Sequence, residues 1–391
     1  MKLVYLIAGT FNAGGMERVL SNKANWFAAR GYEVVIVTTD QRGRVPYFSL
    51  HPDIHTYDLG INYDDTNGRS FLRKAVAFTW KQWRHLRRLT ALLQKLKADV
   101  VVCMFNNDVS FVYKIHDASR KILEAHFSKH KKLQYCRRGF WRLADCWRTW
   151  REERIVRHYD RFVVLTGEDK ELWGNMPNIC VIPNARTFNS EQKAELTQKR
   201  VLAIGRLDYQ KGFDRLIEIW GKVQGALRFA QAQAEQGGQE VQGVQRVQGW
   251  QLNIVGDGLL REELQRQIER LGLQDTVHIL PPTSDIKSVY LRSSILVMTS
   301  RYEGLPMVLI EAQTYGLPIV AYACPCGPRD IINDGVDGFL IPDDDEVCFA
   351  ERLTTLMSDN VLRYRMGAEA MKASERFNEE RIMQQWESIL K

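Results

Sequence analysis

The chain has 391 residues, of which 45% are hydrophobic and 26% are charged. This length exceeds what one hydrophobic core usually holds, so we expect two domains of about 180 residues each. The Gly and Pro contents exclude collagen-like and wholly disordered proteins, and no apolar run reaches the roughly 20 residues that span a bilayer. The seven Cys are scattered and odd in number, which predicts a cytoplasmic protein without structural disulfides or zinc.

The net charge of +7 is divided unequally along the chain. Residues 1–186 contain 31 Lys and Arg against 18 Asp and Glu, whereas the remainder contains 23 against 29. A basic half is typical of proteins that contact nucleic acid or an anionic membrane, and a mildly acidic half suits a soluble ligand held by a few cations.

The first half predicts a parallel α/β sheet. An apolar strand over residues 3–8, which we distinguish from a signal peptide, is followed by a glycine-rich turn at 9–15. A helical pattern over 16–30 and a strand over 34–37 complete a βαβ unit. Further strands are expected at 100–104 and 161–165.

The second half repeats this pattern, which predicts two tandem Rossmann-like domains. Its strands are expected at residues 201–204, 252–255, 277–280, 295–298 and 319–321. Residues 226–249 have seven Gln between Gln231 and Gln248, and we expect a mobile insertion there. An amphipathic segment at 377–390 predicts a closing helix.

Two segments of the second half carry candidate site residues. Glu303 precedes a predicted helix start at Pro306, where the amides of Gly304 and Leu305 lack helical partners and could hold an anion. Glu311 lies two turns into the same apolar helix, so its carboxylate needs a donor, either a ribose or sugar hydroxyl or an arginine.

The other cations and glycines follow predicted strands. Arg206 and Lys211 lie at the carboxyl edge of the second sheet and could clamp a diphosphate, although solvated surface charges are the common alternative. Gly14 and Gly15 precede a helix and could present bare amides to an anion, or only allow close packing.

Together these segments resemble the family 4 retaining glycosyltransferases, which have the GT-B fold. The resemblance spans nearly the whole chain and is carried by Glu303 and Glu311, the Gly205–Gly212 loop, the Val255–Gly258 segment and the Gly14–Arg18 turn. Matching segments also lie at 159–166, 181–184, 326–332 and 335–338. It implies an α/β fold with two Rossmann-like parallel-sheet domains that face a central cleft. The expected domains are 1–185 for the acceptor and 186–373 for the nucleotide-sugar, with helix 374–391 packing back on the first.

The resemblance also implies site roles. Arg206, Lys211, Gly15, Gly304 and Leu305 would bind the donor phosphates and Glu311 the ribose. Glu303 would contact the donor sugar, with a transient nucleophilic role left open. No metal or other cofactor would be required, and Asp343–Asp345 is expected to cap a helix rather than bind metal.

His126 is assigned to the catalytic site by the same resemblance, and Gly14 and Arg18 are acceptor or cleft candidates. Relatives often have Glu and His adjacent, whereas Ala125 separates Glu124 from His126 in this chain. An ordinary core or surface histidine is therefore the alternative. Pro281 and Pro282 stand where relatives usually have a glycine, so base contacts there are in doubt.

Two basic runs interleaved with aromatic residues mark the first half. Residues 69–97 contain nine Lys and Arg and no acid, and residues 129–151 contain eight against one Asp. They predict peripheral contact with an anionic membrane, at the inner face of the plasma membrane, or a site for a lipid-linked acceptor. The alternative is a solvated basic face whose aromatic residues pack inward; no nucleic-acid-binding module is recognisable.

The predicted function is transfer of a sugar from a nucleotide-sugar, with UDP as the first guess, to a glycan or lipid-linked acceptor. The setting implied is the synthesis of surface polysaccharide or lipopolysaccharide. The alternatives are a GT-B sugar-nucleotide epimerase and a non-catalytic basic binding protein. A Rossmann dehydrogenase is disfavoured because the full dinucleotide fingerprint is missing.

Overall fold

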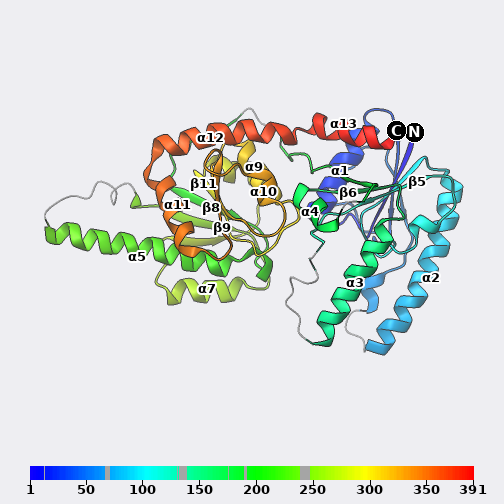
Figure 1. Cartoon of the computed structure of the whole chain (residues 1–391), viewed down its shortest axis with the longest axis horizontal. Coiled ribbons are helices and arrows are strands. Elements are labelled where there is room, and N and C mark those ends of the chain that lie inside the picture. The colour runs from blue at the N-terminus through cyan, green and yellow to red at the C-terminus, as the bar shows by residue number, and fades with distance from the viewer. Residues whose placement is uncertain are drawn as a thin grey trace. The chain divides into compact units, whose positions relative to one another are not determined.

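The computed structural model describes residues 1–12, 14–66, 71–129, 131, 139–174, 176–188, 192–237 and 247–391. Two compact units divide the chain: Met1–Ala185 with Glu380–Lys391 form unit 1, and Arg186–Glu379 form unit 2. Each unit has one parallel β-sheet with helices packed on it (Figure 1). The α/β class expected from the sequence is confirmed.

Unit 1 is built on a seven-stranded sheet of order β3-β2-β1-β4-β5-β6-β7. Every pairing in it is parallel. Its strands are β1 Lys2–Ile7, β2 Glu33–Thr38, β3 His55–Asp58, β4 Val100–Cys103, β5 Arg120–Glu124, β6 Arg161–Val164 and β7 Ile179–Val181. The sequence pattern missed β3, β5 and β7, because β3 is an exposed edge strand, β5 begins with Arg and Lys, and β7 has only three residues.

The sheet of unit 1 is covered on both faces, as a fully parallel sheet requires. Leu3 and Tyr5 of β1 pack with α1 and α13, whereas Val4 and Leu6 pack in the cluster that includes α2, α3 and α4. The helices are α1 Gly15–Ala28, α2 Phe71–Leu96, α3 Phe140–Val156, α4 Gly167–Trp173 and α13 Glu379–Leu390, with short 3-10 turns η1 Tyr63–Thr66 and η2 Val112–Lys114.

Unit 2 is built on a six-stranded parallel sheet of order β10-β9-β8-β11-β12-β13. Its strands are β8 Arg200–Ile204, β9 Gln251–Val255, β10 Val277–Leu280, β11 Ile295–Met298, β12 Ile319–Tyr322 and β13 Gly338–Ile341. In both sheets the chain starts in the middle, runs to one edge and then returns to build the other side. Ligands of such sheets bind at the carboxyl ends of the strands where the direction reverses. In unit 2 that point lies between β8 and β11.

Helices cover the sheet of unit 2 in two sets, α5 with α11 and α9 with α12. Its helices are α5 Phe213–Gly237, α7 Arg261–Arg270, α8 Ile286–Leu291, α9 Met307–Thr314, α10 Pro328–Ile331, α11 Glu346–Ser358 and α12 Asn360–Ser374, with short turns η4 Tyr209–Lys211 and η5 Glu375–Phe377. None of the helices in the described ranges has the length and apolar character needed to cross a membrane.

Two expectations are corrected by these elements. The mobile insertion at 226–249 is wrong for its first part, because α5 continues through Gly237. Ala, Gln, Glu, Leu and Arg are good helix formers, which explains this extension. Residues 238–246 lie outside the described residues, as do residues 69–70, 130 and 132–138 of the basic runs. The chain returns to unit 1 at Glu380, later than residue 374, because η5 still bonds unit 2 through Arg186 N and Phe377 O.

Candidate functional site

Lys211 and Glu303 meet at the reversal point of the unit 2 sheet. Lys211 ends the loop that follows β8, and Glu303 lies in the loop that follows β11. Lys211 Nζ lies 2.7 Å from Glu303 Oε1, with side-chain exposures of 17% and 7%. Because an ammonium and a carboxylate are both shielded from water there, each depends on the other for its charge partner. The structure therefore brings together two residues that the sequence analysis proposed separately.

Glycines allow the loops to approach this closely. Gly212 has a φ of +63°, and a Cβ there would lie 2.2 Å from the carbonyl oxygen of Thr299. Thr299 Oγ1 also donates to the carbonyl oxygen of Gly212 at 2.9 Å, which fixes the two loops together. A Cβ on Gly256 would lie 1.9 Å from the oxygen of Gly205, so the loop after β9 supports the loop after β8.

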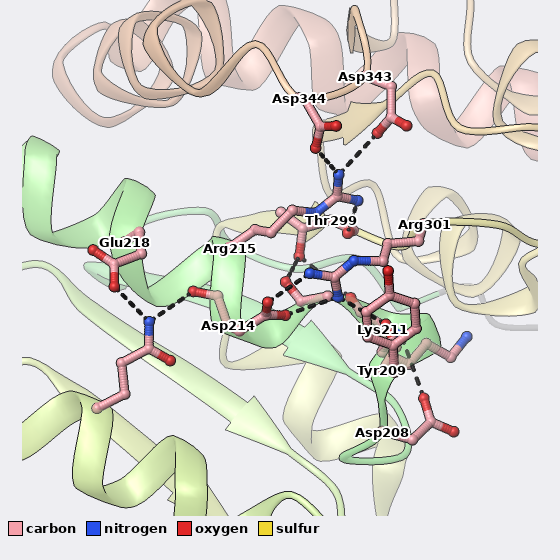
Figure 2. Close-up of polar contacts among 12 residues, drawn as sticks. Asp208, Tyr209, Lys211, Asp214, Arg215, Glu218, Thr299, Arg301, Asp343 and Asp344 are labelled. Carbon is pink, nitrogen blue, oxygen red and sulfur yellow. Dashed lines mark hydrogen bonds and ion pairs between the residues drawn. The ribbon is translucent and has the colours of Figure 1, made fainter. Parts of the chain in front are cut away.

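A set of polar contacts holds the same loops in register (Figure 2). Arg301 donates to both carboxylate oxygens of Asp214, at 2.9 and 2.5 Å, and to the carbonyl oxygen of Tyr209 at 2.8 Å. Gln210 Nε2 donates to the carbonyl oxygen of Tyr302 at 3.0 Å. Burial opposes ionisation of Asp214, but the hydrogen bonds from Arg301 prevail and lower the pKa of its carboxyl group.

Arg215 links the start of α5 to the loop that follows β11 and to the acidic run that follows β13. Two of the three Asp residues of that run are therefore ion-pair partners of Arg215. Its guanidinium group donates to the carbonyl oxygen of Thr299 at 2.6 Å, to Asp343 Oδ1 at 3.1 Å and to Asp344 (Figure 2). Asp345 caps α11 by accepting from the amide of Cys348 at 3.0 Å. The helix-capping prediction is confirmed for Asp345. Across the described part of the chain, no group of three His, Cys, Asp or Glu side chains could hold a metal ion.

The start of α9 lies beside Glu303. Gly304 and Leu305 precede Pro306, the N-cap residue of this helix. Within the described ranges, the amides of Gly304 and Leu305 donate no hydrogen bond. Gly327 packs against this segment with a φ of +98°, and a Cβ there would lie 2.4 Å from Pro306 Cδ. The loop is thus held close to the chain that follows β12, with its amides available to an acceptor.

Arg206 and Glu311 differ sharply in exposure. The Arg206 side chain is 74% exposed and its guanidinium group lies 3.3 Å from Asp208 Oδ2. Glu311 is buried in α9, and Tyr290 Oη donates to its Oε2 at 2.7 Å. The sequence predicted a ribose or sugar hydroxyl, or an arginine, as the donor, and gave no signal for this tyrosine. Burial and the charge of Glu311 raise the pKa of Tyr315, which stacks on Tyr290, to about 12.

In unit 1, Gly14 and Gly15 begin α1 at the carboxyl end of β1. Gly14 is the N-cap residue, and a Cβ on Gly15 would meet no atom within 4 Å. The backbone of Gly15 is therefore open to approach. Arg18 lies one turn into the helix, with its guanidinium carbon 5.0 Å from the ring centre of Phe48.

His126 follows β5 and belongs to a buried charge cluster. Its Nε2 lies 3.2 Å from Glu124 Oε1, without the alignment of a hydrogen bond, and its side chain is 7% exposed. Lys23 Nζ contacts both oxygens of Glu124, at 2.6 and 2.5 Å. Burial raises the pKa of Glu124, but Lys23 and His126 outweigh it and hold that pKa at about 2. A lysine among the apolar residues of α1 was the sequence signal for this cluster, and the sequence analysis missed it.

Two family models match the chain. Residues 13–186 match Glycosyltransferase Family 4, and residues 185–373 match Glycosyl transferases group 1.

Two curated relatives that are named as glycosyltransferases, and one solved structure, match this chain over nearly their full lengths. The amylovoran biosynthesis glycosyltransferase AmsD of Erwinia amylovora is 28% identical, over 100% of this chain and 99% of its own. A Campylobacter jejuni α-1,4-N-acetyl-D-galactosaminyltransferase, whose name includes an oligosaccharide-PP-undecaprenol, is 26% identical over 100% of this chain and 98% of its own. A structure of S. aureus TarM with UDP, α-GlcNAc-glycerol and fondaparinux superposes with a TM-score of 0.73 at 16% identity. The match covers 100% of this chain and 99% of the TarM chain.

Two Rossmann-like parallel sheets in tandem, together with the solved structures that superpose on the whole chain, define the GT-B fold. The chain belongs to the family 4 glycosyltransferases. Its relatives act in the synthesis of surface polysaccharides and lipopolysaccharides.

Proposed function

We propose that this protein transfers a sugar from a UDP-sugar to a glycan or lipid-linked acceptor, with retention of anomeric configuration and without a metal ion. The observation that carries the proposal is the Lys211–Glu303 pair, 2.7 Å apart at the reversal point of the unit 2 sheet. The choice of UDP is supported by the TarM structure, which contains UDP. Retention and metal independence are expectations from the family.

The proposed chemistry needs cations where the leaving group gathers charge. When the bond between the sugar C1 and the diphosphate oxygen breaks, negative charge collects on the β-phosphate. Lys211 Nζ, the exposed guanidinium group of Arg206 and the amides of Gly304 and Leu305 would stabilise that charge. Positioned donors of this kind are typically worth about 10²–10³ in rate each. The phosphate would in turn help to deprotonate the acceptor hydroxyl on the same face.

The carboxylates would bind hydroxyl groups. Glu303 would accept from hydroxyls of the donor sugar, which then compete with Lys211 for its oxygens. Glu311 would bind the ribose while it keeps its contact with Tyr290. From unit 1, the proposal assigns the amide of Gly15 to the donor phosphates and His126 to the sugar, and it places Gly14 and Arg18 with the acceptor.

We further propose that the protein is peripheral at the inner face of the plasma membrane. The support is the excess of basic residues in the first half of the chain, together with a relative that is named for a PP-undecaprenol-linked oligosaccharide. An anionic bilayer surface attracts such a basic segment, and a lipid-linked acceptor would be present there.

The first test is a screen of UDP-, GDP-, ADP- and CMP-sugars in EDTA by thermal shift and by slow hydrolysis of the donor. A ligand that binds only the native state raises the unfolding temperature, so the UDP-sugars should do so. The matched variant is Glu303→Gln, which keeps the side-chain size and should lose hydrolysis by about a hundredfold or more.

The anomer of the transferred or hydrolysed sugar, followed by NMR in the first turnovers, tests retention. A response confined to another nucleotide would reject the choice of UDP. Activity that requires a divalent ion, or the absence of any response, would contradict the proposed chemistry. Conversion of the UDP-sugar to its epimer without release of UDP would favour the epimerase.

A further inference from the structure

Helices α2 and α3 of unit 1 expose four large indole rings. Trp80 and Trp83 of α2 are 53% and 52% exposed, and Trp147 and Trp150 of α3 are 56% and 47% exposed. We name these four residues the tryptophan surface. Exposed aromatic groups that gather in this way mark an interaction site rather than ordinary surface.

Three of the four rings line two neighbouring hollows: Trp147 lines one, and Trp80 and Trp83 line the other. The first is a groove of about 600 Å³ that runs between the two helices and is lined by Phe78 and Gln82 of α2 and by Trp147 and Arg151 of α3. Thr79 lines this groove and also the neighbouring hollow formed with Trp80 and Trp83. Figure 1 shows α2 and α3 with their N-terminal ends directed to the same side of unit 1.

A guanidinium group lies over each ring of the tryptophan surface. An arginine four residues further along the same helix places its guanidinium group over the indole, as the helical repeat allows. The distances from guanidinium carbon to ring centre are 5.0 Å for Arg84 on Trp80, 4.8 Å for Arg87 on Trp83, 5.7 Å for Arg151 on Trp147 and 3.9 Å for Arg154 on Trp150.

Hydrogen bonds to a loop fix the rotation of α2 that exposes the rings. Lys81, Arg84 and Arg88 donate to the carbonyl oxygens of Asn62, Gly60 and Leu59. These three basic side chains are thus bonded to the protein, whereas Arg87 and the indole rings of Trp80 and Trp83 are exposed to solvent. This is the reverse of the alternative in which the aromatic residues pack inward. The helix has no acidic residue, so nothing on it would repel an anionic partner.

We infer that the tryptophan surface, with the exposed side chains of Arg87, Arg151 and Arg154, binds the headgroup region of an anionic bilayer. Indole rings prefer this region because one edge is polar and the rest apolar, and arginines there meet lipid phosphates. An arginine that stands on an indole can hold a phosphate oxygen while the ring enters the apolar boundary. The inference rests on the membrane contact in the proposed function and assigns it to named residues.

The test is flotation of the full-length protein with vesicles of 70% phosphatidylcholine and 30% phosphatidylglycerol, and with phosphatidylcholine alone. Wild type should bind the mixed vesicles, and its tryptophan emission should shift to the blue and be quenched by brominated lipid. Replacement of all four tryptophans with Ala, and the double reversal Arg87→Glu with Arg151→Glu, should each lower partitioning by about tenfold or more.

Matched controls lie in unit 2. Arg266→Glu with Lys287→Glu makes the same change in net charge at exposed positions, and Leu259→Ala removes a 99% exposed apolar side chain. Both should leave partitioning unchanged. Partitioning that falls equally in the control reversal, or that survives loss of the four tryptophans, would overturn the inference. Binding to a single-stranded oligonucleotide but to neither vesicle would overturn it as well.

The result of the vesicle-binding test can be distinguished from the result of the test of the proposed reaction. Hydrolysis of the UDP-sugar is measured without vesicles, and the tryptophan variant should keep it. A failure of vesicle binding with intact hydrolysis therefore rejects only the membrane surface. Vesicle binding without hydrolysis in wild type rejects only the reaction.

Discussion

The ammonium group of Lys211 lies 2.7 Å from the carboxylate of Glu303, although the two residues are 92 positions apart in the chain. The pair is positioned by the adjacency of β8 and β11 and by Gly212, whose missing side chain lets the loops meet. In the proposed reaction, a diphosphate would take the cation and the sugar hydroxyls would take the carboxylate. The pair therefore has both a structural and a functional consequence, which variants can separate.

Lys211→Met should lower both stability and UDP affinity. It leaves Glu303, which is 7% exposed, without its cation, and an unpaired buried group costs about 1–3 kcal/mol. The double variant with Glu303→Gln removes that unpaired charge and should recover most of the stability but neither UDP affinity nor hydrolysis. Urea unfolding and calorimetric titration with UDP measure the two effects. Recovery of UDP binding in the double variant would show that Lys211 does not contact the phosphates.

Gly212→Ala should destabilise unit 2 by about 1–3 kcal/mol, because a strained φ of +63° adds to a collision with the Thr299 carbonyl. Gly335→Ala is the matched control, since Gly335 has a φ of +74° but open space around its Cα. The difference between the two unfolding free energies measures the collision alone. Equal costs would mean that the two loops can separate without penalty, contrary to the geometry.

Glu311→Gln should weaken UDP binding by about tenfold, the value of one charge-assisted hydrogen bond to a ribose hydroxyl. It should also abolish the preference for UDP over 2′-deoxy-UDP. Tyr290→Phe is the comparison, because it removes the donor that lies 2.7 Å from Glu311 Oε2 without removing the carboxylate. If both variants lower only the unfolding temperature and leave the preference intact, Glu311 has a structural role alone.

The buried cluster of unit 1 predicts a pH dependence of stability. The pKa of Glu124 is about 2 against an ordinary value of 4.5, so its contribution to stability is present above pH 4.5 and is lost as the pH falls toward 2. Burial lowers the pKa of Lys23, yet even a buried lysine remains protonated in that acidic range.

The measurement compares urea unfolding of wild type and Glu124→Gln at about pH 3 and about pH 5. The stability advantage of wild type should shrink at the lower pH, because only wild type takes up this proton on unfolding. Lys23→Met should cost about 3–5 kcal/mol at pH 5, since it leaves a buried carboxylate unpaired. An advantage that does not change with pH would show that folding does not lower the pKa of Glu124.

The class of fold could be predicted from the sequence because its signals are local. Apolar strands followed by turns and helices define parallel sheets, and the order of the glycine and charge motifs specifies the family. The strands at 295–298 and 277–280 were predicted with their observed bounds. The strands β3, β5 and β7 were missed, because an exposed strand, a strand that begins with Arg and Lys, and a strand of three residues carry too little apolar pattern to be separated from a loop.

The candidate residues of unit 2 were also visible in the sequence, but only as separate segments. Lys211, Glu303 and Gly304 could be selected by type and position, since cations, carboxylates and glycines at strand ends suit a nucleotide-sugar. Tyr290 could not be selected, because nothing local relates it to Glu311. Gly212 could be noted as a glycine, but the atom that its Cβ would meet belongs to a distant loop.

The sequence by itself determined the fold class, the family and the types of residue at the ligand edge. Only the tertiary structure decided which charges meet: Lys211 with Glu303, and Lys23 with Glu124. It also decided that the tryptophans of α2 face solvent while neighbouring basic residues turn inward. The physical reason is that strand order and helix rotation are set by long-range packing, and partners far apart in the chain leave no local periodicity to detect.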